Sequence, residues 1–174
     1  INIDGTNENY SNVTIDGQDV TQITIDGQDV LSTIPDSVVS RPDDNDSGSV
    51  TSDHGLAIEF AESFDKFGAR ISNNTSGVTT ARVRDPNGDV IDSTDVSNLS
   101  SGDAFTLSGD FRANTEYQVI LNADGNSFTV GLRNDATAYP YTSTDVDIVG
   151  RVFGTTTDTN PAHALNDIGN VGFN

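Results

Sequence analysis

The stretch VTTARVRDPNGDVIDS at residues 78–93 decides the fold class of this chain. Apolar and polar residues alternate on both sides of Pro86-Asn87-Gly88-Asp89, a sequence that is typical of a tight turn. Successive side chains of a strand point to opposite faces, so this alternation indicates extended chain. The pattern predicts two antiparallel strands, 78–85 and 90–93, joined as a hairpin.

Similar short stretches recur along the chain, at 55–61, 67–71, 104–107, 117–123, 128–133 and 145–153. The stretches 117–123 and 128–133 flank Asp124-Gly125-Asn126 and are predicted to form a second hairpin. At most a single helical turn is expected, near 61–67 or 161–167. The spacing predicts an all-β fold, an antiparallel β-sandwich or jelly roll. Its expected aromatic core is Phe60, Phe64, Phe105, Phe111, Tyr117, Phe128 and Phe153.

An internal repeat precedes the predicted sandwich. NVTIDGQDVT at 12–21 is followed by QITIDGQDVL at 22–31, and residues 1–6 are a degenerate third copy. Each copy alternates and then turns at Asp-Gly, which predicts a miniature β-hairpin. Such a hairpin needs neighbours, either adjacent copies, other chains, or the main domain against which it packs as a small meander. For contacts between chains, the candidate residues are Ile15, Val20, Ile23, Ile25 and Val30.

The predicted organisation has four parts. Residues 1–34 are short N-terminal β-hairpin repeats that form a shaft or anchor, and 35–54 are a linker rich in Asp, Ser and Gly. The sandwich covers 55–153. Residues 154–174 are a C-terminal extension that either lies across a neighbouring surface or is loosely ordered. Because the chain starts at Ile1 within a β pattern, we expect a processed chain or a piece of a longer protein.

The amino-acid composition indicates a protein adapted to very high salt. The chain has 27 acidic and 8 basic residues, a formal net charge of −19, and its acids are nearly all Asp. At molar salt the Debye length falls to about 3 Å, which screens the repulsion between these charges. The charge argues against nucleic acid and anionic membranes as partners, and no apolar run predicts membrane insertion. Without cysteine, no disulfide or thiolate chemistry is available.

The tandem ITIDGQDV units resemble short repeats in tail and appendage proteins of haloarchaeal tailed viruses. The stretches ISNNTSG at 71–77, ARVRDPNG at 81–88 and YPY at 139–141 resemble a sandwich module of tail-fibre and adhesin-like proteins. The resemblance implies an extracellular virion protein, a homotrimer that assembles with other virion proteins. The hairpins would form the shaft, and the sandwich would face host surface glycans or a surface-layer protein.

A second interpretation is a haloarchaeal cell-surface protein. It would be either a carbohydrate-binding module or a filament subunit in which an N-terminal strand completes a neighbour's sheet. Catalysis is not expected, because the only histidines are His54 and His163 and neither a serine elbow nor a phosphate loop is present. No cofactor is required, and calcium is the one candidate.

Two loops are candidate calcium sites. Asp43, Asn45 and Ser47 place oxygen ligands at alternating positions before a glycine-containing stretch, but position 54, where a calcium loop has Glu, is His. Asp85, Asn87 and Asp89 form a second oxygen cluster. The alternative for both loops is a solvated acidic loop, or side chains that fix the backbone through Asx turns.

Sugar chemistry adds two further sets of candidates. Tyr139 and Tyr141 flank Pro140 in a loop, so they form either a platform that stacks on sugar faces or a cap on the open end of the sandwich. Sequons occur at Asn9, Asn12, Asn45, Asn73, Asn74 and Asn98, and the candidate N-glycosylation sites are Asn9, Asn12, Asn74 and Asn98.

Overall fold

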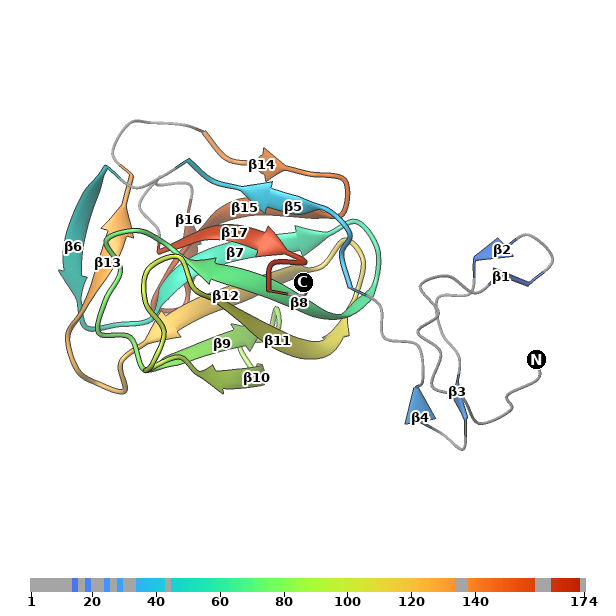
Figure 1. Ribbon diagram of the computed structural model, residues 1–174, viewed down its shortest axis with the longest axis horizontal. Helices are drawn as coiled ribbons and strands as arrows, with labels where there is room; N and C mark the ends of the chain where they lie inside the picture. The colour runs from blue at the N-terminus through green and yellow to red at the C-terminus, as the bar shows by residue number, and fades with distance from the viewer. Residues whose placement is uncertain are drawn as a thin grey trace. The chain divides into compact units, whose positions relative to one another are not determined.

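The computed structural model (Figure 1) describes residues 34–42, 45–133, 138–158 and 164–172, together with the backbone of four strands between residues 14 and 29. The chain divides into two units, Ile1–Thr33 and Ile34–Asn174.

The described strands of the first unit occupy equivalent positions in two copies of the repeat. β1 (Thr14–Ile15) pairs antiparallel with β2 (Gln18–Asp19), and β3 (Thr24–Ile25) pairs in the same way with β4 (Gln28–Asp29). The third, degenerate copy lies outside the described residues.

The second unit consists of antiparallel sheets. The seven-stranded sheet has the order β10-β9-β12-β7-β15-β14, with β16 paired to β15, and the four-stranded sheet has the order β11-β8-β17-β5. A separate pair joins β13 to β6. The strands are β5 (Val38–Ser40), β6 (Asp46–Val50), β7 (His54–Phe60), β8 (Phe64–Ile71), β9 (Thr80–Arg84), β10 (Val90–Asp95), β11 (Ala104–Phe111), β12 (Glu116–Asn122), β13 (Phe128–Leu132), β14 (Tyr141–Thr142), β15 (Val146–Phe153), β16 (Thr156–Asp158) and β17 (Leu165–Gly169).

These strands confirm the predicted all-β class. No helix occurs among the residues that the structure describes, and the arrangement is that of an antiparallel β-sandwich. The predicted hairpin at 78–93 is present as β9 and β10, with Val90 opposite Arg84.

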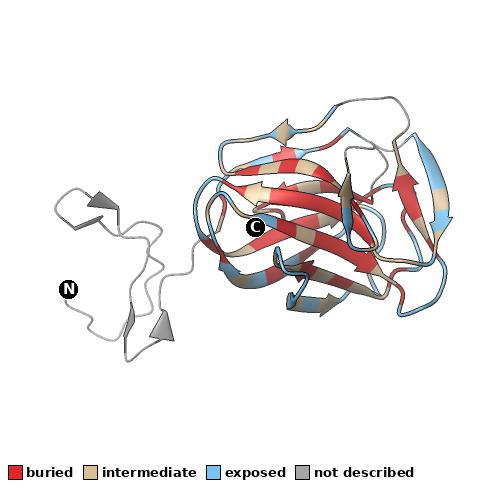
Figure 2. Cartoon of the chain, turned by 180° about the vertical axis from the view of Figure 1, so that it is seen from behind, coloured by how far each residue is buried: buried red, intermediate tan, exposed pale blue. Residues whose placement is uncertain are grey.

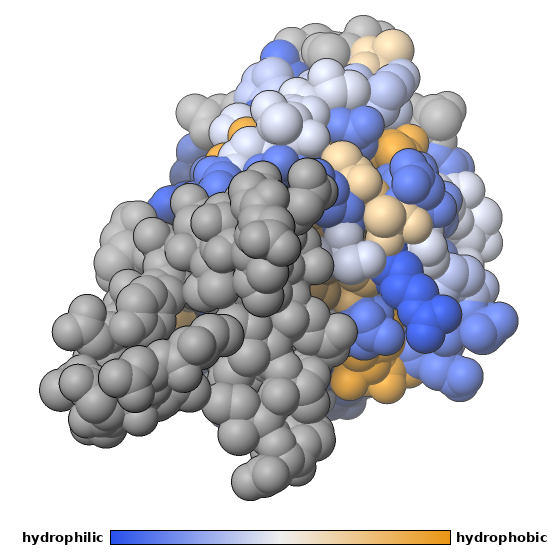
Figure 3. Space-filling view, turned by 90° about the vertical axis from the view of Figure 1, so that its right-hand side faces the viewer, coloured by the Kyte–Doolittle hydropathy of each residue, from blue (hydrophilic) through white to orange (hydrophobic). Residues whose placement is uncertain are grey.

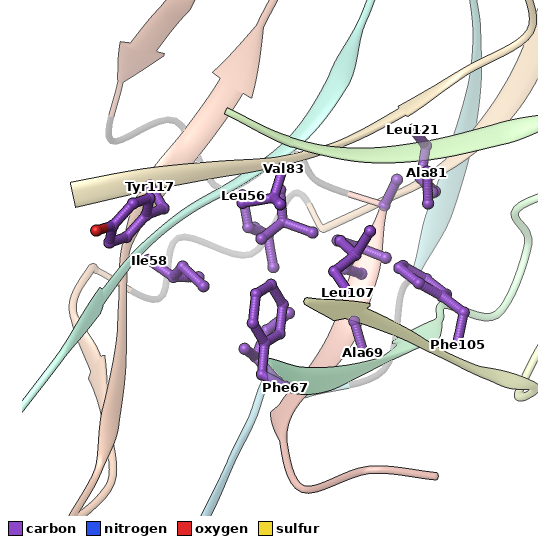
Figure 4. Packing of buried hydrophobic residues seen from close by; sticks show 14 of the residues in the cluster. Leu56, Ile58, Phe67, Ala69, Ala81, Val83, Phe105, Leu107, Tyr117 and Leu121 are labelled. Carbon is purple, nitrogen blue, oxygen red and sulfur yellow. The ribbon is translucent and has the colours of Figure 1, made fainter. Parts of the chain in front are cut away.

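The hydrophobic core lies between the two large sheets (Figure 4). Leu56 and Ile58 of β7 alternate with residues that face away, and they meet Phe67 and Leu107 of the opposite sheet. Figure 2 shows the buried residues concentrated along these central strands. Aromatic rings fill one part of the core, with centroid distances of 5.0 Å for Phe67–Phe111 and 5.4 Å for Phe60–Phe67.

The predicted aromatic core is correct except at Phe153. That side chain is 48% exposed, whereas the other six residues are buried. Phe153 is the last residue of β15, and its ring lies edge-on to His54 at 5.9 Å.

Side chains link the two large sheets near their edges. On one side, the backbone N–H of Ser108 on β11 donates to the Asp92 carboxylate on β10 at 2.7 Å. On the other side, the Ser37 N–H, just before β5, donates to the Asp145 carboxylate, just before β15, at 2.7 Å. The Asp145 N–H in turn donates to Ser37 Oγ at 2.9 Å. The first contact joins the edge strands β10 and β11, and the second joins the edge strand β5 to β15, which lies inside its sheet.

The predicted sandwich range, 55–153, was too short at both ends. The segment 35–54, predicted as a linker, contains β5 and β6, which pair with β17 and β13. In the predicted C-terminal extension, β17 lies between β8 and β5 inside the four-stranded sheet. Leu165 and Ile168 of β17 are fully buried, so this strand contributes to the core.

At most one helical turn was expected, and β8 and β17 lie where it was placed, near 61–67 and 161–167. One local prediction was wrong. β12 and β13 do not form the second hairpin, although a turn with a hydrogen bond from Asn126 N to Ala123 O does join them. The reason is that β7 and β9 already occupy both edges of β12, so β13 pairs with β6 instead.

Candidate functional site

A polar groove of about 440 Å³ lies where β9, β12 and the β15–β16 turn meet. It is lined by Arg84, Asp85, Pro86, Asn87, Gly88, Glu116, Gln118 and Thr155. On β12, Tyr117 and Val119 point into the core, so Glu116 and Gln118 point to the opposite face of the sheet. The groove therefore belongs to the outer face of the seven-stranded sheet.

Arg84 is held at the groove by two acceptors. Its Nη2 donates to Asp53 Oδ2 in a short ion pair, and its Nη1 donates to the Gly154 carbonyl at 3.1 Å. The other Asp53 oxygen accepts a hydrogen bond from the Asn122 amide, and the Asp53 carbonyl accepts one from Gly154 N–H at 2.8 Å. The guanidinium is thus fixed and its charge is neutralised within the fold.

A chain of hydrogen bonds orients the two β12 side chains. Gln118 Nε2 donates to Thr157 Oγ1 at 3.2 Å, and the Thr157 hydroxyl donates to Glu116 Oε1 at 2.8 Å. Gln118 Nε2 also approaches the Thr155 carbonyl at 3.4 Å. Among the described residues, Gln118 Oε1 and Glu116 Oε2 have no hydrogen-bond partner, which leaves two acceptors beside the groove.

The turn on the other side of the groove is an Asx turn. Asp85 Oδ1 accepts the N–H groups of Asn87 and Asp89, each at 2.9 Å, and Asp85 Oδ2 accepts Asn87 Nδ2 at 3.0 Å. The hydrogen bond from Asp89, assisted by those from Asn87, holds the pKa of Asp85 below its ordinary value. Gly88 has a φ of 90°, the left-handed conformation that glycine adopts without strain.

The structure therefore gives Asp85, Asn87 and Asp89 the Asx-turn role that was the alternative to calcium binding. In the other predicted calcium loop, Asp43 lies outside the described residues, and the chain from Asp46 onward is strand β6 rather than a curved loop. Asn45 and Ser47 are exposed there. The described part of the chain holds no group of three or more His, Asp or Glu side chains arranged for a metal ion.

Tyr139 and Tyr141 pack against the core. Their rings are perpendicular with centroids 5.4 Å apart, and both hydroxyl oxygens are buried. Burial raises the pKa of Tyr139 well above its ordinary value. This arrangement matches the capping alternative rather than a platform with exposed ring faces.

His54 is a buried polar residue that the sequence analysis assigned to the linker. It is 2% exposed at the start of β7, and neither ring nitrogen has a hydrogen-bond partner among the described residues. Burial, assisted by the nearby Arg151 charge and opposed by Asp158, lowers the pKa of His54 to about 4. The imidazole is therefore neutral at neutral pH.

The remaining predicted residues are distributed as follows. Asn74 and Asn98 are exposed, and Asn74 has a φ of 62° in the turn after β8. Asn9, Asn12, Val20, Ile23 and Val30 lie outside the described residues. Ile15 and Ile25 lie in β1 and β3, where only the backbone is described.

No family model matches this chain, and comparisons with curated proteins and with solved structures find no significant match. In the described ranges, no helix has the length and apolar character needed to cross a membrane. The likeness to viral appendage proteins therefore stays a prediction.

Proposed function

We propose that this chain is a non-enzymatic structural protein of a virion appendage, such as a tail fibre or spike, of a halophilic archaeal virus. The observation that carries the proposal is the division of the chain into a repeat unit and a sandwich unit that has its own core. In this account residues 1–33 assemble a homotrimer and join it to other virion proteins. The sandwich is displayed on the virion surface, outside the cell.

The charge distribution supports a role in concentrated salt. Arginines that would otherwise offset the acidic surface are bound to aspartates: Arg70 to Asp167, Arg82 to Asp124, Arg84 to Asp53, Arg112 to Asp110 and Arg151 to Asp158. Arg41 is 3% exposed and donates to the Leu165 carbonyl at 3.0 Å. The described surface visible in Figure 3 is mainly hydrophilic. Such a surface needs salt to screen its excess carboxylates.

The preference for Asp over Glu has a structural basis that fits the same role. Short carboxylates reach back to the N–H groups of their own turns, as Asp95 does to Ser97 and Asp103 does to Ser100, both at 2.8 Å. These bonds order the exposed turns of the sandwich. An ordered, acidic and hydrated surface is suited to attachment to host surface glycans or a surface-layer protein in brine.

A cell-surface filament subunit is the second candidate, and strand β6 favours it. Within the described residues β6 pairs only with β13, so one of its edges has no partner strand. An added strand from a neighbouring chain would complete that edge. A carbohydrate-binding module on a cell surface is the other form of this candidate.

Electron microscopy of the full chain in about 2 M KCl, where surface charges are screened, separates these candidates. The appendage proposal expects discrete trimeric particles of uniform length. Open fibres that disappear when residues 1–33 are removed would contradict it and favour the filament subunit. Single sandwiches without assembly would contradict both and favour the free-standing binding module.

A further inference from the structure

The groove beside Arg84 presents hydrogen-bonding groups whose positions are set before any ligand arrives. Arg84 is fixed by Asp53 and Gly154, and Glu116 is fixed through Thr157. Preorganised polar groups lose little conformational entropy on binding, so they are suited to recognising a polar ligand.

The charges in the groove argue against ions as ligands. An anion would meet the carboxylates of Asp85 and Glu116, and the only lining cation, Arg84, is already paired with Asp53. A metal cation would need several free oxygens at once. Both Asp85 oxygens accept hydrogen bonds within the turn, and Glu116 has one oxygen in use.

The other hydrogen-bonding groups of the groove are suited to binding vicinal hydroxyls. Gln118 Oε1 and Glu116 Oε2 are acceptors without a partner among the described residues, while the Asn87 amide and the Arg84 guanidinium supply N–H groups. A sugar hydroxyl both donates and accepts, so it satisfies both kinds of group at once. Pro86 and Gly88 add a small surface without polar side chains, and space above Gly88 is open.

We propose that this groove binds a neutral saccharide unit through Glu116, Gln118, Asn87 and Arg84. The inference rests on the proposed function in one respect, since it names the chemistry by which the displayed sandwich contacts a host surface. It places sugar recognition on the outer face of the seven-stranded sheet, in a groove whose lining does not include Tyr139 or Tyr141.

The test is an NMR titration of the deuterated full chain in about 2 M KCl. The probes are methyl glucoside, methyl galactoside and methyl mannoside, with glucuronate and inorganic phosphate as anionic controls. The expected result is saturable shifts of the Gln118 and Asn87 side-chain amides and the Arg84 Nε–H with at least one hexoside, and none with the anions.

A matched pair of variants makes the test specific. Glu116→Gln keeps the size of the side chain but removes the charged acceptor, so hexoside binding weakens about tenfold. Glu62→Gln is the control, because Glu62 is exposed and lies outside the groove. Unchanged backbone spectra show that each variant is folded.

Three outcomes would overturn the inference: no saturable shift with any hexoside, shifts centred on Tyr139 and Tyr141, or equal weakening by both variants. Light scattering on the same samples separates this failure from that of the proposed function. A trimer that binds no hexoside contradicts the groove alone, and a monomer that binds one contradicts the appendage alone.

Discussion

Arg84 and Asp53 form an ion pair that joins strand β9 to the residue just before β7. Each side chain is 13% exposed, so the pair is largely withdrawn from water. The same carboxylate accepts the Asn122 amide of β12, which makes Asp53 the common acceptor for two neighbouring strands. The pair both stabilises the sandwich and holds Arg84 in place at the groove.

Replacing Asp53→Asn leaves the Arg84 guanidinium without its counter-charge. We expect the free energy of unfolding to fall by about 3 kcal/mol, the typical cost of leaving one partner of a buried pair alone. Urea unfolding of the second unit in about 2 M KCl measures this, because urea leaves the ionic strength unchanged.

The exposed pair of Arg112 and Asp110 provides the control. Arg112 Nη2 and Asp110 Oδ2 are 3.5 Å apart, and the two side chains are 75% and 79% exposed. Asp110→Asn is therefore expected to change the free energy of unfolding by less than about 1 kcal/mol. Similar losses for the two variants would contradict the role assigned to Asp53.

His54 makes stability depend on pH. Its pKa is 6.5 in the unfolded chain and about 4 in the fold. Between these values the unfolded chain binds more protons, so stability falls as pH falls, by about 3 kcal/mol in total once pH is below about 4.

Urea unfolding of the chain and of His54→Leu between about pH 6.5 and 4.5 measures this contribution. The carboxylates of Asp85, Asp95 and Asp124 have lowered pKa values, because hydrogen bonds stabilise their charged forms, so they titrate below this window. The free energy of unfolding of the unmodified chain, minus that of His54→Leu, is expected to increase as pH rises. Parallel curves through the window would show that the folded chain does not hold His54 neutral.

The C-terminal segment is expected to be required for the fold. A Cβ atom on Gly68 of β8 would overlap the carbonyl oxygen of Val171. Gly68→Ala should therefore displace residues 170–172 and lower the free energy of unfolding by about 3 kcal/mol. Hydrogen exchange should show faster amides in β17 as well. Gly102→Ala is the control, since it has open space and only the cost of its φ of 88°, about 1 kcal/mol.

How much of this fold the sequence predicts depends on how local each feature is. The hairpin at 78–93 carries its turn and both strands in one stretch, and β9 and β10 form as predicted. β13 was assigned the wrong partner because the choice depends on β7 and β9 covering both edges of β12. β17 has the sequence LNDIG, which resembles a polar tail, and it becomes a strand only through β8 and β5.

The candidate site was predictable only in part for the same reason. Asp85 and Asn87 attracted attention as an oxygen cluster, and they do line the groove, although as an Asx turn. Gln118 showed only the alternation of the strand predicted at 117–123, and Glu116 lay just before that strand. Thr155 lay in a segment assigned to the tail, and nothing in the sequence indicates that it reaches β12.

Salt should stabilise this protein. Raising KCl from about 0.2 M to 2 M screens repulsion among the excess carboxylates, so the free energy of unfolding should rise. Urea unfolding at fixed pH across that range measures the trend. A flat or falling trend would contradict adaptation to concentrated salt.

The mass of the particle in solution tests the central claim most directly. Light scattering in about 2 M KCl compares the full chain with residues 34–174, which retain the sandwich core. The account predicts a trimer of the 18.4 kDa full chain and a monomer of the truncated one. Monomers in both samples, or trimers in both, would contradict assembly through the N-terminal repeats.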